Sequence, residues 1–322
     1  MRAIVQDTYG TADALELQDI DRPVAGRGEV LVAVRAAGVD AGVVHLMEGT
    51  PLLVRLGYGL RRPRHRVPGL DMAGLVAAVG PDVTECSPGD EVMGIGKGAF
   101  AEYAIAPAAK LVPRPASLSF VAAAALPISG LTGLQAVRDT GGVSAGQRVL
   151  VVGAAGGVGT YAVQVAVALG AEVTGVCSTT KLELVRSLGA IDAIDYTVQD
   201  FTDGSRTWDV IIDTAGNRRL AVLRRALAPD GTLVLVGADG EGRWLSGLDR
   251  HLRAAILSPF TRQRLRPMLS VERKEDLVVL ADMVATGDVA PVIDQTFPLA
   301  EAPAAIRHVQ QGRARGKVVV TT

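Results

Sequence analysis

A run of small residues between an apolar segment and a helical pattern is the part of this chain best suited to bind a phosphate. Residues 148–152 predict a buried strand, and residues 160–169 predict a helix with an apolar face. Gly159 lets that helix pack close to the strand, and the helix N-terminus favours an anion. Because Gly156 and Gly157 lack side chains, backbone N–H groups can approach a pyrophosphate there. The predicted contacts of this dinucleotide-binding turn come from Ala155, Gly156, Gly157 and Val158.

The sequence around the turn both weakens and supports this interpretation. Ala154 stands where the first glycine of the G-x-G-x-x-G pattern is expected. A second strand, predicted at residues 172–176, follows at the spacing of a βαβ unit. The alternative is a tight turn in another kind of α/β protein.

The end of the second predicted strand lacks the acid that selects NAD. NAD-binding units usually carry Asp or Glu about 20 residues after the glycines, where it holds the ribose 2′-hydroxyl. No acid occurs here between Glu172 and Glu183, and the segment offers Ser178, Thr179 and Lys181 instead. Hydroxyl and ammonium groups hydrogen-bond a 2′-phosphate, so we predict NADP as the cofactor. Alternatively, Ser178 and Thr179 only cap the helix that begins near Lys181.

The overall composition excludes several classes of protein. The chain has 322 residues, a formal net charge of −1 and 4% aromatic residues, so we expect neither a nucleic-acid nor a membrane partner. No apolar run reaches the roughly 18 residues of a membrane-spanning helix, and the N-terminus begins with a strand pattern rather than a signal peptide. Cys86 and Cys177 are too few for a disulfide framework, so the cytoplasm is the expected location.

Hydrophobic periodicity divides the chain into two kinds of structure. Residues 1–117 show short strands separated by proline and glycine turns, which indicates a β-rich domain. Residues 120–137 form a helical segment broken at Pro127. Residues 148–237 alternate between strands and helices, with further strands predicted at residues 193–196, 209–213 and 232–236 and helices at residues 181–188 and 217–227. This alternation predicts a parallel sheet with helices on both faces. A helix is predicted over residues 272–286, followed by two strands and a helix near residues 302–310.

Several short motifs occur in order along almost the whole chain. They are PGLDMAG (68–74), GDEVMG (89–94), GAFAEY (98–103), LP with GLTG (126–133), AGGVG (155–159) and GKVVV (316–320). With these motifs the chain resembles the medium-chain dehydrogenase/reductase superfamily, in its zinc-free quinone oxidoreductase (zeta-crystallin-like) branch. The resemblance implies an α/β fold in which a Rossmann doubly wound parallel sheet is inserted into a GroES-like β-rich catalytic domain. Residues 1–120, completed by 285–322, would form the GroES-like domain, and residues 121–284 the NADP-binding domain.

The same resemblance implies roles for individual residues and a homodimer. Thr132 would line the nicotinamide ribose, and Ser178 and Lys181 would meet the 2′-phosphate. Tyr196 matches a tyrosine near that phosphate, although a core tyrosine at a strand end is the alternative. The residues expected where the carboxyl edge of the sheet faces the cofactor are Asn217, Gly237 and Ala238.

The metal ligands of zinc-dependent relatives are missing from this chain. Asp40 stands where those relatives have a cysteine, and Leu70-Asp71 replaces their His-Glu pair. Two cysteines cannot build a four-cysteine zinc lobe, and the four histidines show no paired ligand spacing. We therefore predict that the protein binds no metal.

Two side chains are candidates for catalysis. Asp40 is predicted to face the cleft in which the cofactor and the substrate meet, where it would orient the ribose hydroxyls or relay a proton. Alternatively, it caps a helix beginning near Gly42. Tyr58 is a second candidate proton donor, with packing on a loop surface as the alternative. Arginines at 55–66 and 243–266 would attract an acidic substrate or a carrier-bound thioester. Alternatively, these segments are solvated or oligomer-facing loops with internal ion pairs.

These features predict an NADPH-dependent, zinc-independent reductase that transfers hydride to a small-molecule quinone or α,β-unsaturated carbonyl. Conjugated acceptors suit an enzyme without a metal because the developing charge spreads onto oxygen, where fixed hydrogen-bond donors stabilise it. A metal-free alcohol dehydrogenase or an enoyl-thioester reductase is the alternative enzyme. A noncatalytic NADPH-binding protein with a sensor or structural role is the alternative of another class.

Overall fold

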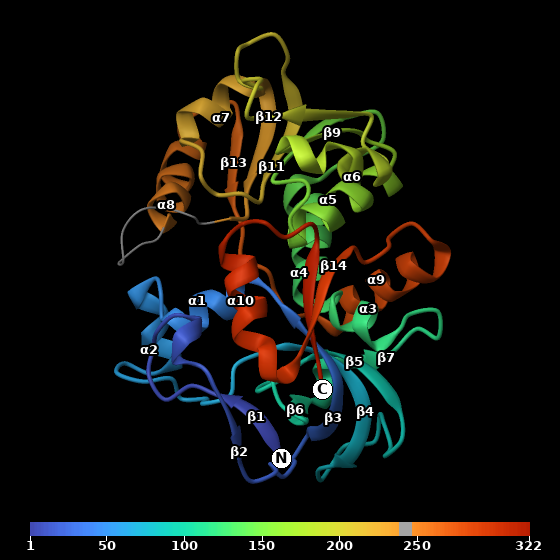
Figure 1. Ribbon diagram of the computed structural model, residues 1–322. Helices are drawn as coiled ribbons and strands as arrows, with labels where there is room; N and C mark the ends of the chain where they lie inside the picture. The colour runs from blue at the N-terminus through green and yellow to red at the C-terminus, as the bar shows by residue number, and fades with distance from the viewer. Residues whose placement is uncertain (238–246) are drawn as a thin grey trace. The chain divides into compact units, whose positions relative to one another are not determined.

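The computed structural model describes residues 1–237 and 247–322 and divides the chain into two units, each with its own sheet (Figure 1). The first unit comprises Met1–Ser129, Glu272–Ala285 and Pro291–Thr322, and the second comprises Gly130–Val271 and Thr286–Ala290. Residues 121–129 and 272–284 were expected in the nucleotide-binding domain, but they pack with the first unit.

The first unit is built on a seven-stranded, largely antiparallel sheet. Its strands, with those of a separate two-stranded sheet, are β1 (Arg2–Val5), β2 (Glu16–Asp19), β3 (Glu29–Val39), β4 (Asp71–Val79), β5 (Glu91–Ile95), β6 (Tyr103–Pro107), β7 (Leu111–Pro113), β14 (Ile293–Pro298) and β15 (Lys317–Thr321). The order is β14-β15-β3-β4-β5-β7, with β6 paired to β3. The last strand of the chain, β15, pairs antiparallel with β3, so the C-terminal segment completes this sheet.

Branched aliphatic residues explain why the long strand β3 lies at the centre of the first sheet. Val30, Val32 and Val34 are buried, and branched side chains pack well on a pleated surface. They belong to a core that also contains Phe100 and Ile306. The helices of this unit are α1 (Ala41–Glu48), α2 (Arg55–Tyr58), α3 (Phe120–Ala124), α9 (Lys274–Thr286) and α10 (Ala302–Gln310).

The second unit contains a six-stranded sheet in the order β10-β9-β8-β11-β12-β13, with every pair parallel. These strands are β8 (Arg148–Val152), β9 (Glu172–Cys177), β10 (Asp192–Asp195), β11 (Trp208–Asp213), β12 (Leu227–Leu235) and β13 (Arg264–Pro267). The chain adds strands outward in one direction from β8 and then in the other, so the order reverses between β8 and β11. This is the predicted doubly wound Rossmann topology, in which ligands bind where the order reverses.

Helix α4 (Pro127–Leu134) precedes the first strand of this sheet. Four helices among the described residues connect consecutive strands: α5 (Gly157–Ala168), α6 (Leu182–Ser187), α7 (Leu220–Ala226) and α8 (Leu248–Leu257). Helices α5 and α6 pack against β8, β9 and β10, whereas α7 and α8 pack against β12 and β13. Within the described part of the chain, no helix combines the length and apolar character needed to cross a bilayer.

The predicted strands of the second unit are confirmed within about one residue, except at β12. That strand begins at Leu227, five residues before the predicted start at Thr232. The preceding helix is correspondingly shorter, Leu220–Ala226 instead of residues 217–227. Helix α8 and strand β13 occupy a stretch for which the sequence pattern predicts no element.

Candidate functional site

The turn after β8 has a conformation that requires glycine at two positions. Gly153 has φ +83°, and its N–H and that of Ala154 both donate to the Val176 carbonyl at 3.1 Å. A Cβ on Gly159 would lie 2.0 Å from the Gly153 oxygen, a backbone atom that cannot move aside cheaply. The close approach of α5 to β8, predicted from Gly159, is therefore present.

The N-terminus of α5 offers backbone donors to a ligand. Gly156 is the N-cap residue, and it has no side chain to accept a hydrogen bond from the first N–H groups of the helix. The first N–H groups of a helix have no acceptor within it, and the helix dipole favours an anion at this end. Gly156, Gly157 and Val158 are partly exposed, whereas the Ala155 side chain is buried, so Ala155 offers only its backbone. The turn is a glycine cradle that fits the diphosphate of a dinucleotide.

Other predicted cofactor residues lie near this turn or at the ends of neighbouring strands. Gly133, next to Thr132 on α4, packs so closely that a Cβ would lie 2.8 Å from the Tyr161 Cβ on α5. Gly237 follows β12, and a Cβ there would lie 2.5 Å from the Thr214 carbonyl oxygen after β11. Asn217 is exposed in the same connection after β11. Ala238 lies outside the described residues.

A carboxylate that the sequence analysis did not consider lies at the end of β9. Asp195 ends β10 opposite Cys177, and its side chain accepts a hydrogen bond from the Thr179 hydroxyl. It also accepts from the Thr197 backbone N–H at 2.9 Å, and these hydrogen bonds, the Thr179 one foremost, lower the pKa of Asp195. Thr179 is therefore engaged by an acid, which makes it a weaker candidate for a 2′-phosphate contact than the sequence predicts.

Tyr196 follows Asp195 and lies beside the end of β9. Its N–H donates to the Cys177 carbonyl at 3.2 Å, and 50% of the residue is exposed. Tyr196 is thus not a core residue, which removes the alternative considered for it. Its position is compatible with a contact to a group bound at Ser178.

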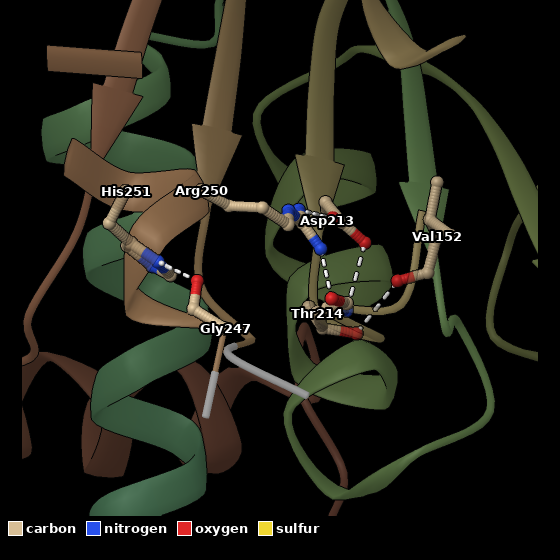
Figure 2. Close-up of polar contacts among 7 residues, drawn as sticks. Val152, Asp213, Thr214, Gly247, Arg250 and His251 are labelled. Carbon is tan, nitrogen blue, oxygen red and sulfur yellow. Dashed lines mark hydrogen bonds and ion pairs between the residues drawn. The ribbon is translucent and has the colours of Figure 1, made fainter. Parts of the chain in front are cut away.

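A buried ion pair lies at the carboxyl end of β11 (Figure 2). The Arg250 guanidinium on α8 contacts the Asp213 carboxylate and donates to the Gly216 carbonyl. Asp213 also accepts from the Gly216 N–H at 3.2 Å, while the Thr214 hydroxyl donates to the Val152 carbonyl at 2.8 Å. Burial raises the pKa of Asp213, and the Arg250 charge opposes that rise. These contacts fasten α8 to the sheet edge where the strand order reverses.

The other arginines of the 243–266 segment are also engaged within the second unit. Arg253 pairs with Asp249 on α8, and Arg262 pairs with Asp230 at 2.9 Å. Arg264 and Arg266 donate to Thr232 and to the Thr140 carbonyl. The ion-paired interpretation thus holds for Arg253 and Arg262, whereas Arg264 and Arg266 hydrogen-bond to neutral groups. Arg243 lies outside the described residues.

In the first unit, Asp40 caps a helix, as the alternative interpretation held. It is the N-cap residue of α1, and its Oδ1 accepts from the Val43 N–H at 3.0 Å. Asp40 is 8% exposed, and its Oδ2 is buried without a hydrogen-bond partner among the described residues. A buried carboxylate oxygen without a partner is costly, so capping alone does not account for this side chain.

Asp71, which follows Leu70 in the PGLDMAG motif, belongs to a buried hydrogen-bond network with Lys317 and Ser129. Its carboxylate accepts from the Ile128 N–H at 3.0 Å and lies 3.4 Å from the Lys317 ammonium, which also donates to the Ser129 hydroxyl at 2.9 Å. Burial raises the pKa of Asp71 to about 7, opposed by the Lys317 charge and reinforced by Asp40. The network joins the start of β4 to the start of β15.

Tyr58 is the last residue of α2 and lines a cavity of about 200 Å³ in the first unit. Its carbonyl accepts from the Arg64 N–H at 2.8 Å, which fixes the loop after α2. Tyr58 is 39% exposed. Asp40 is not part of this cavity's lining.

The side chains at the positions of the zinc ligands do not fit a metal site. Leu70 has no donor atom and lines the cavity, and Asp71 is held by Lys317. In residues 1–237 and 247–322, no cluster of three or more His, Cys, Asp or Glu side chains could hold a metal ion.

Comparisons with known proteins cover the whole chain. An alcohol dehydrogenase GroES-like domain matches residues 26–116, and a zinc-binding dehydrogenase model matches residues 188–320. The chain is 33% identical to the mitochondrial NAD(P)H oxidoreductase RTN4IP1 of Mus musculus, over 99% of this chain and 89% of that protein.

Two solved structures extend the similarity to the fold. The quinone oxidoreductase from Coxiella burnetii has a TM-score of 0.85 and 29% identity, covering 100% of this chain and 99% of that one. Mycobacterial Rv1454c, solved in complex with NADPH, has a TM-score of 0.84 and 26% identity, covering 100% of both chains.

Proposed function

Because this chain belongs to the medium-chain dehydrogenase/reductase superfamily, in its quinone oxidoreductase-like branch, we propose that it is an NADPH-dependent, zinc-independent reductase of quinones or α,β-unsaturated carbonyls. Membership makes it an NAD(P)H-dependent oxidoreductase. The choice of NADPH, the absence of a catalytic zinc and the class of acceptor constitute the proposal.

One observation carries the proposal: the uncapped N-terminus of α5 follows a glycine turn at the point where the strand order of the sheet reverses. This position is the binding site for dinucleotides in doubly wound sheets. Bound NADPH would supply a hydride to the acceptor. The backbone N–H groups of the turn would hold the diphosphate, and Ser178 and Lys181 would hold the 2′-phosphate.

Two side chains of the first unit are proposed to act on the acceptor or the cofactor ribose. Charge develops on the acceptor oxygen during reduction, and a fixed donor stabilises it there. Tyr58 supports such a role because its side chain borders a cavity. Asp40 supports a role in orienting a hydroxyl or relaying a proton, because its buried Oδ2 has no partner among the described residues.

The cofactor preference is tested by substitutions at the end of β9. We expect Lys181→Met and Ser178→Ala each to raise the KM for NADPH by about tenfold and to leave the KM for NADH within about twofold, because each removes a hydrogen bond to the 2′-phosphate. Thr180→Ala, an exposed neighbour, is the matched control and should change neither value. An affinity for NADH equal to that for NADPH in the wild type would contradict the preference.

The reaction is tested by following NADPH absorbance with a panel of quinones, enones, enoyl thioesters and alcohols. Turnover of quinones or enones, unaffected by chelators, supports the proposal. Gly156→Ala would place a Cβ in the phosphate cradle, 3.3 Å from the Gly153 oxygen. It should weaken NADPH binding, and its circular dichroism spectrum shows whether the fold accommodates this close backbone contact. Tight NADPH binding without turnover of any compound would support the noncatalytic alternative, and turnover confined to thioesters or alcohols the other enzymes.

The homodimer and the cytoplasmic location stay predictions. Analytical ultracentrifugation at micromolar concentration tests the first, and fluorescence microscopy of the tagged protein in its own cell tests the second.

A further inference from the structure

The cavity lined by Tyr58 has both apolar and charged lining residues. Its apolar part comes from α1 and from the turn before β4, with Val43, Leu46, Met47 and Leu70. Its volume of about 200 Å³ is smaller than the roughly 300–1,000 Å³ of typical ligand pockets. The cavity therefore suits one end of a ligand rather than a whole drug-sized molecule.

Every ionisable side chain on the border of this cavity is a cation or a neutral group. The border contains Arg64, His65 and Lys97 together with Tyr58, and no carboxylate lines it. Backbone hydrogen bonds fix these residues: Arg64 N–H donates to the Tyr58 carbonyl at 2.8 Å, and Lys97 N–H donates to Ile105 at 2.8 Å. Two positive charges thus line the cavity from backbone that is held by hydrogen bonds.

Two neighbouring arginines of this loop form contacts within the protein. Arg66 pairs with Asp7 through two hydrogen bonds, and Arg55 lies over the Tyr9 ring and donates to the Gly49 carbonyl. Arg64 and Lys97 are exposed and form no ion pair within the described part of the chain. Arg55 and Arg66 are therefore engaged within the protein, whereas Arg64 and Lys97, which lies after β5, are exposed beside the cavity.

The pKa of His65 is sensitive to the positive charges beside the cavity. Burial, followed by the charges of Lys97 and Arg64, lowers the pKa of His65. No carboxylate of the described residues lines the cavity to offset these two charges, so no lining group favours the imidazolium. An anion placed here would relieve this repulsion and raise the pKa of His65.

We propose that this cavity binds the anionic end of the acceptor, an oxyanion of the carboxylate or phosphate type attached to an apolar quinone or enone. The oxyanion would lie between Arg64 and Lys97, and the apolar part would lie against Met47 and Leu70. This inference rests on the proposed function, since the occupant is the acceptor of that reaction. It narrows the substrate class from neutral conjugated carbonyls to acidic ones.

The test compares three enones that differ only at the para position of a phenyl ring: benzylideneacetone, its carboxylate derivative and its phosphate ester. We expect the KM of at least one anionic enone to be about tenfold below that of the neutral compound, and to rise as NaCl increases from 50 to 500 mM. The neutral compound should show no salt dependence. The ranking of the two anionic compounds distinguishes a carboxylate from a phosphate ligand.

Binding is also measured without turnover, by calorimetry with 4-(3-oxobutyl)benzoate, the saturated product of the carboxylate enone. Lys97→Met and Arg64→Gln should each weaken its affinity by about three- to tenfold, the range between an exposed pair and a charged hydrogen bond. Arg61→Gln, in the same loop but outside the lining, is the matched control and should bind like the wild type. Affinity should increase as the pH falls from 8 to 6, and this increase should be lost in His65→Gln.

The outcomes separate the inference from the proposed function. If 4-(3-oxobutyl)benzoate binds and its affinity depends on Lys97 and Arg64, but no enone or quinone is reduced, the function fails and the anion site stands. If neutral and anionic enones are reduced with equal KM and neither variant changes the affinity by twofold, the function stands and the anion site is refuted. Circular dichroism of each variant confirms that the fold is retained.

Discussion

Lys317→Met tests whether the buried network of the first unit depends on its ion pair. The residue is 1% exposed and Asp71 is 0% exposed, and the two charged groups lie 3.4 Å apart. Methionine keeps most of the length of the side chain but removes the ammonium, so Asp71 loses the cation that opposes its desolvation. At pH 8, where the Asp71 carboxyl is ionised, removing one partner of the buried pair costs about 3–5 kcal/mol in the free energy of unfolding.

The pH dependence of this loss follows from the pKa of Asp71. In the wild type it is raised from 3.8 to about 7, so its stabilising contribution is complete below pH 3.8 and is lost as the pH rises through 7. Without Lys317 the folded pKa rises further, so the variant continues to lose about 1.4 kcal/mol per pH unit above pH 7 while the wild type does not. The difference between them should grow by about 1.4 kcal/mol from pH 7 to pH 8 and stay constant from pH 5 to pH 7.

The assay is urea unfolding followed by far-ultraviolet circular dichroism at pH 5, 6, 7 and 8. Hydrogen exchange of peptides covering β15 assigns the loss to the first unit. Lys274→Met is the control, since its contact with Glu85 is surface-exposed and should be worth about 1 kcal/mol or less at every pH. A loss below about 1 kcal/mol for Lys317→Met, or one that is equal at pH 6 and pH 8, would refute the reasoning.

Three further predictions concern the candidate site. Gly159→Ala should lower the free energy of unfolding by about 1–3 kcal/mol and abolish the NADPH-induced rise in Tm, because its Cβ would lie 2.0 Å from the Gly153 oxygen; an undiminished Tm rise would contradict this. Arg250→Met should destabilise the second unit by about 3–5 kcal/mol in urea unfolding, because it leaves the Asp213 carboxylate buried without its cation; a loss no larger than that of Arg253→Met would show that the pair is dispensable. Asp40→Asn should lower kcat with little change in Tm, because asparagine caps a helix as well as aspartate does. A wild-type kcat in Asp40→Asn, together with a lower Tm in Asp40→Ala alone, would mean that Asp40 only caps the helix. Tyr58→Phe should lower kcat less than Asp40→Ala does.

The nucleotide-binding turn illustrates what could be predicted from the sequence. Its strand, turn and helix are contiguous, and the reason for Gly159 is local because the helix must approach the strand it follows. The Rossmann topology was also predictable, since alternating strands and helices permit few arrangements. The boundaries of β12 were not, because its first residues pair with β11 at Trp208 across a bulge that has no local sequence signal.

The end of β9, where the cofactor is selected, shows a contact that the local sequence could not predict. The absence of an acid between Glu172 and Glu183 is correct for that segment, yet Asp195 arrives from the neighbouring strand and binds the Thr179 hydroxyl. The arginine segments show the same limit. Their composition is alike, but the second is engaged by Asp213, Asp230 and Asp249, whereas the first leaves Arg64 beside a cavity.

The sequence by itself determined the strand-turn-helix unit, because its residues are contiguous, and the family resemblance, because its motifs occur in order along the chain. It left the helix cap at Asp40 as one of two interpretations. Only the tertiary structure decided which charges neutralise one another: Lys317 meets Asp71 across 246 residues, and Arg250 meets Asp213 across 37. The physical reason is that sheet order brings distant strands together. A buried charge must find its partner among those neighbours in space, whatever their separation along the chain.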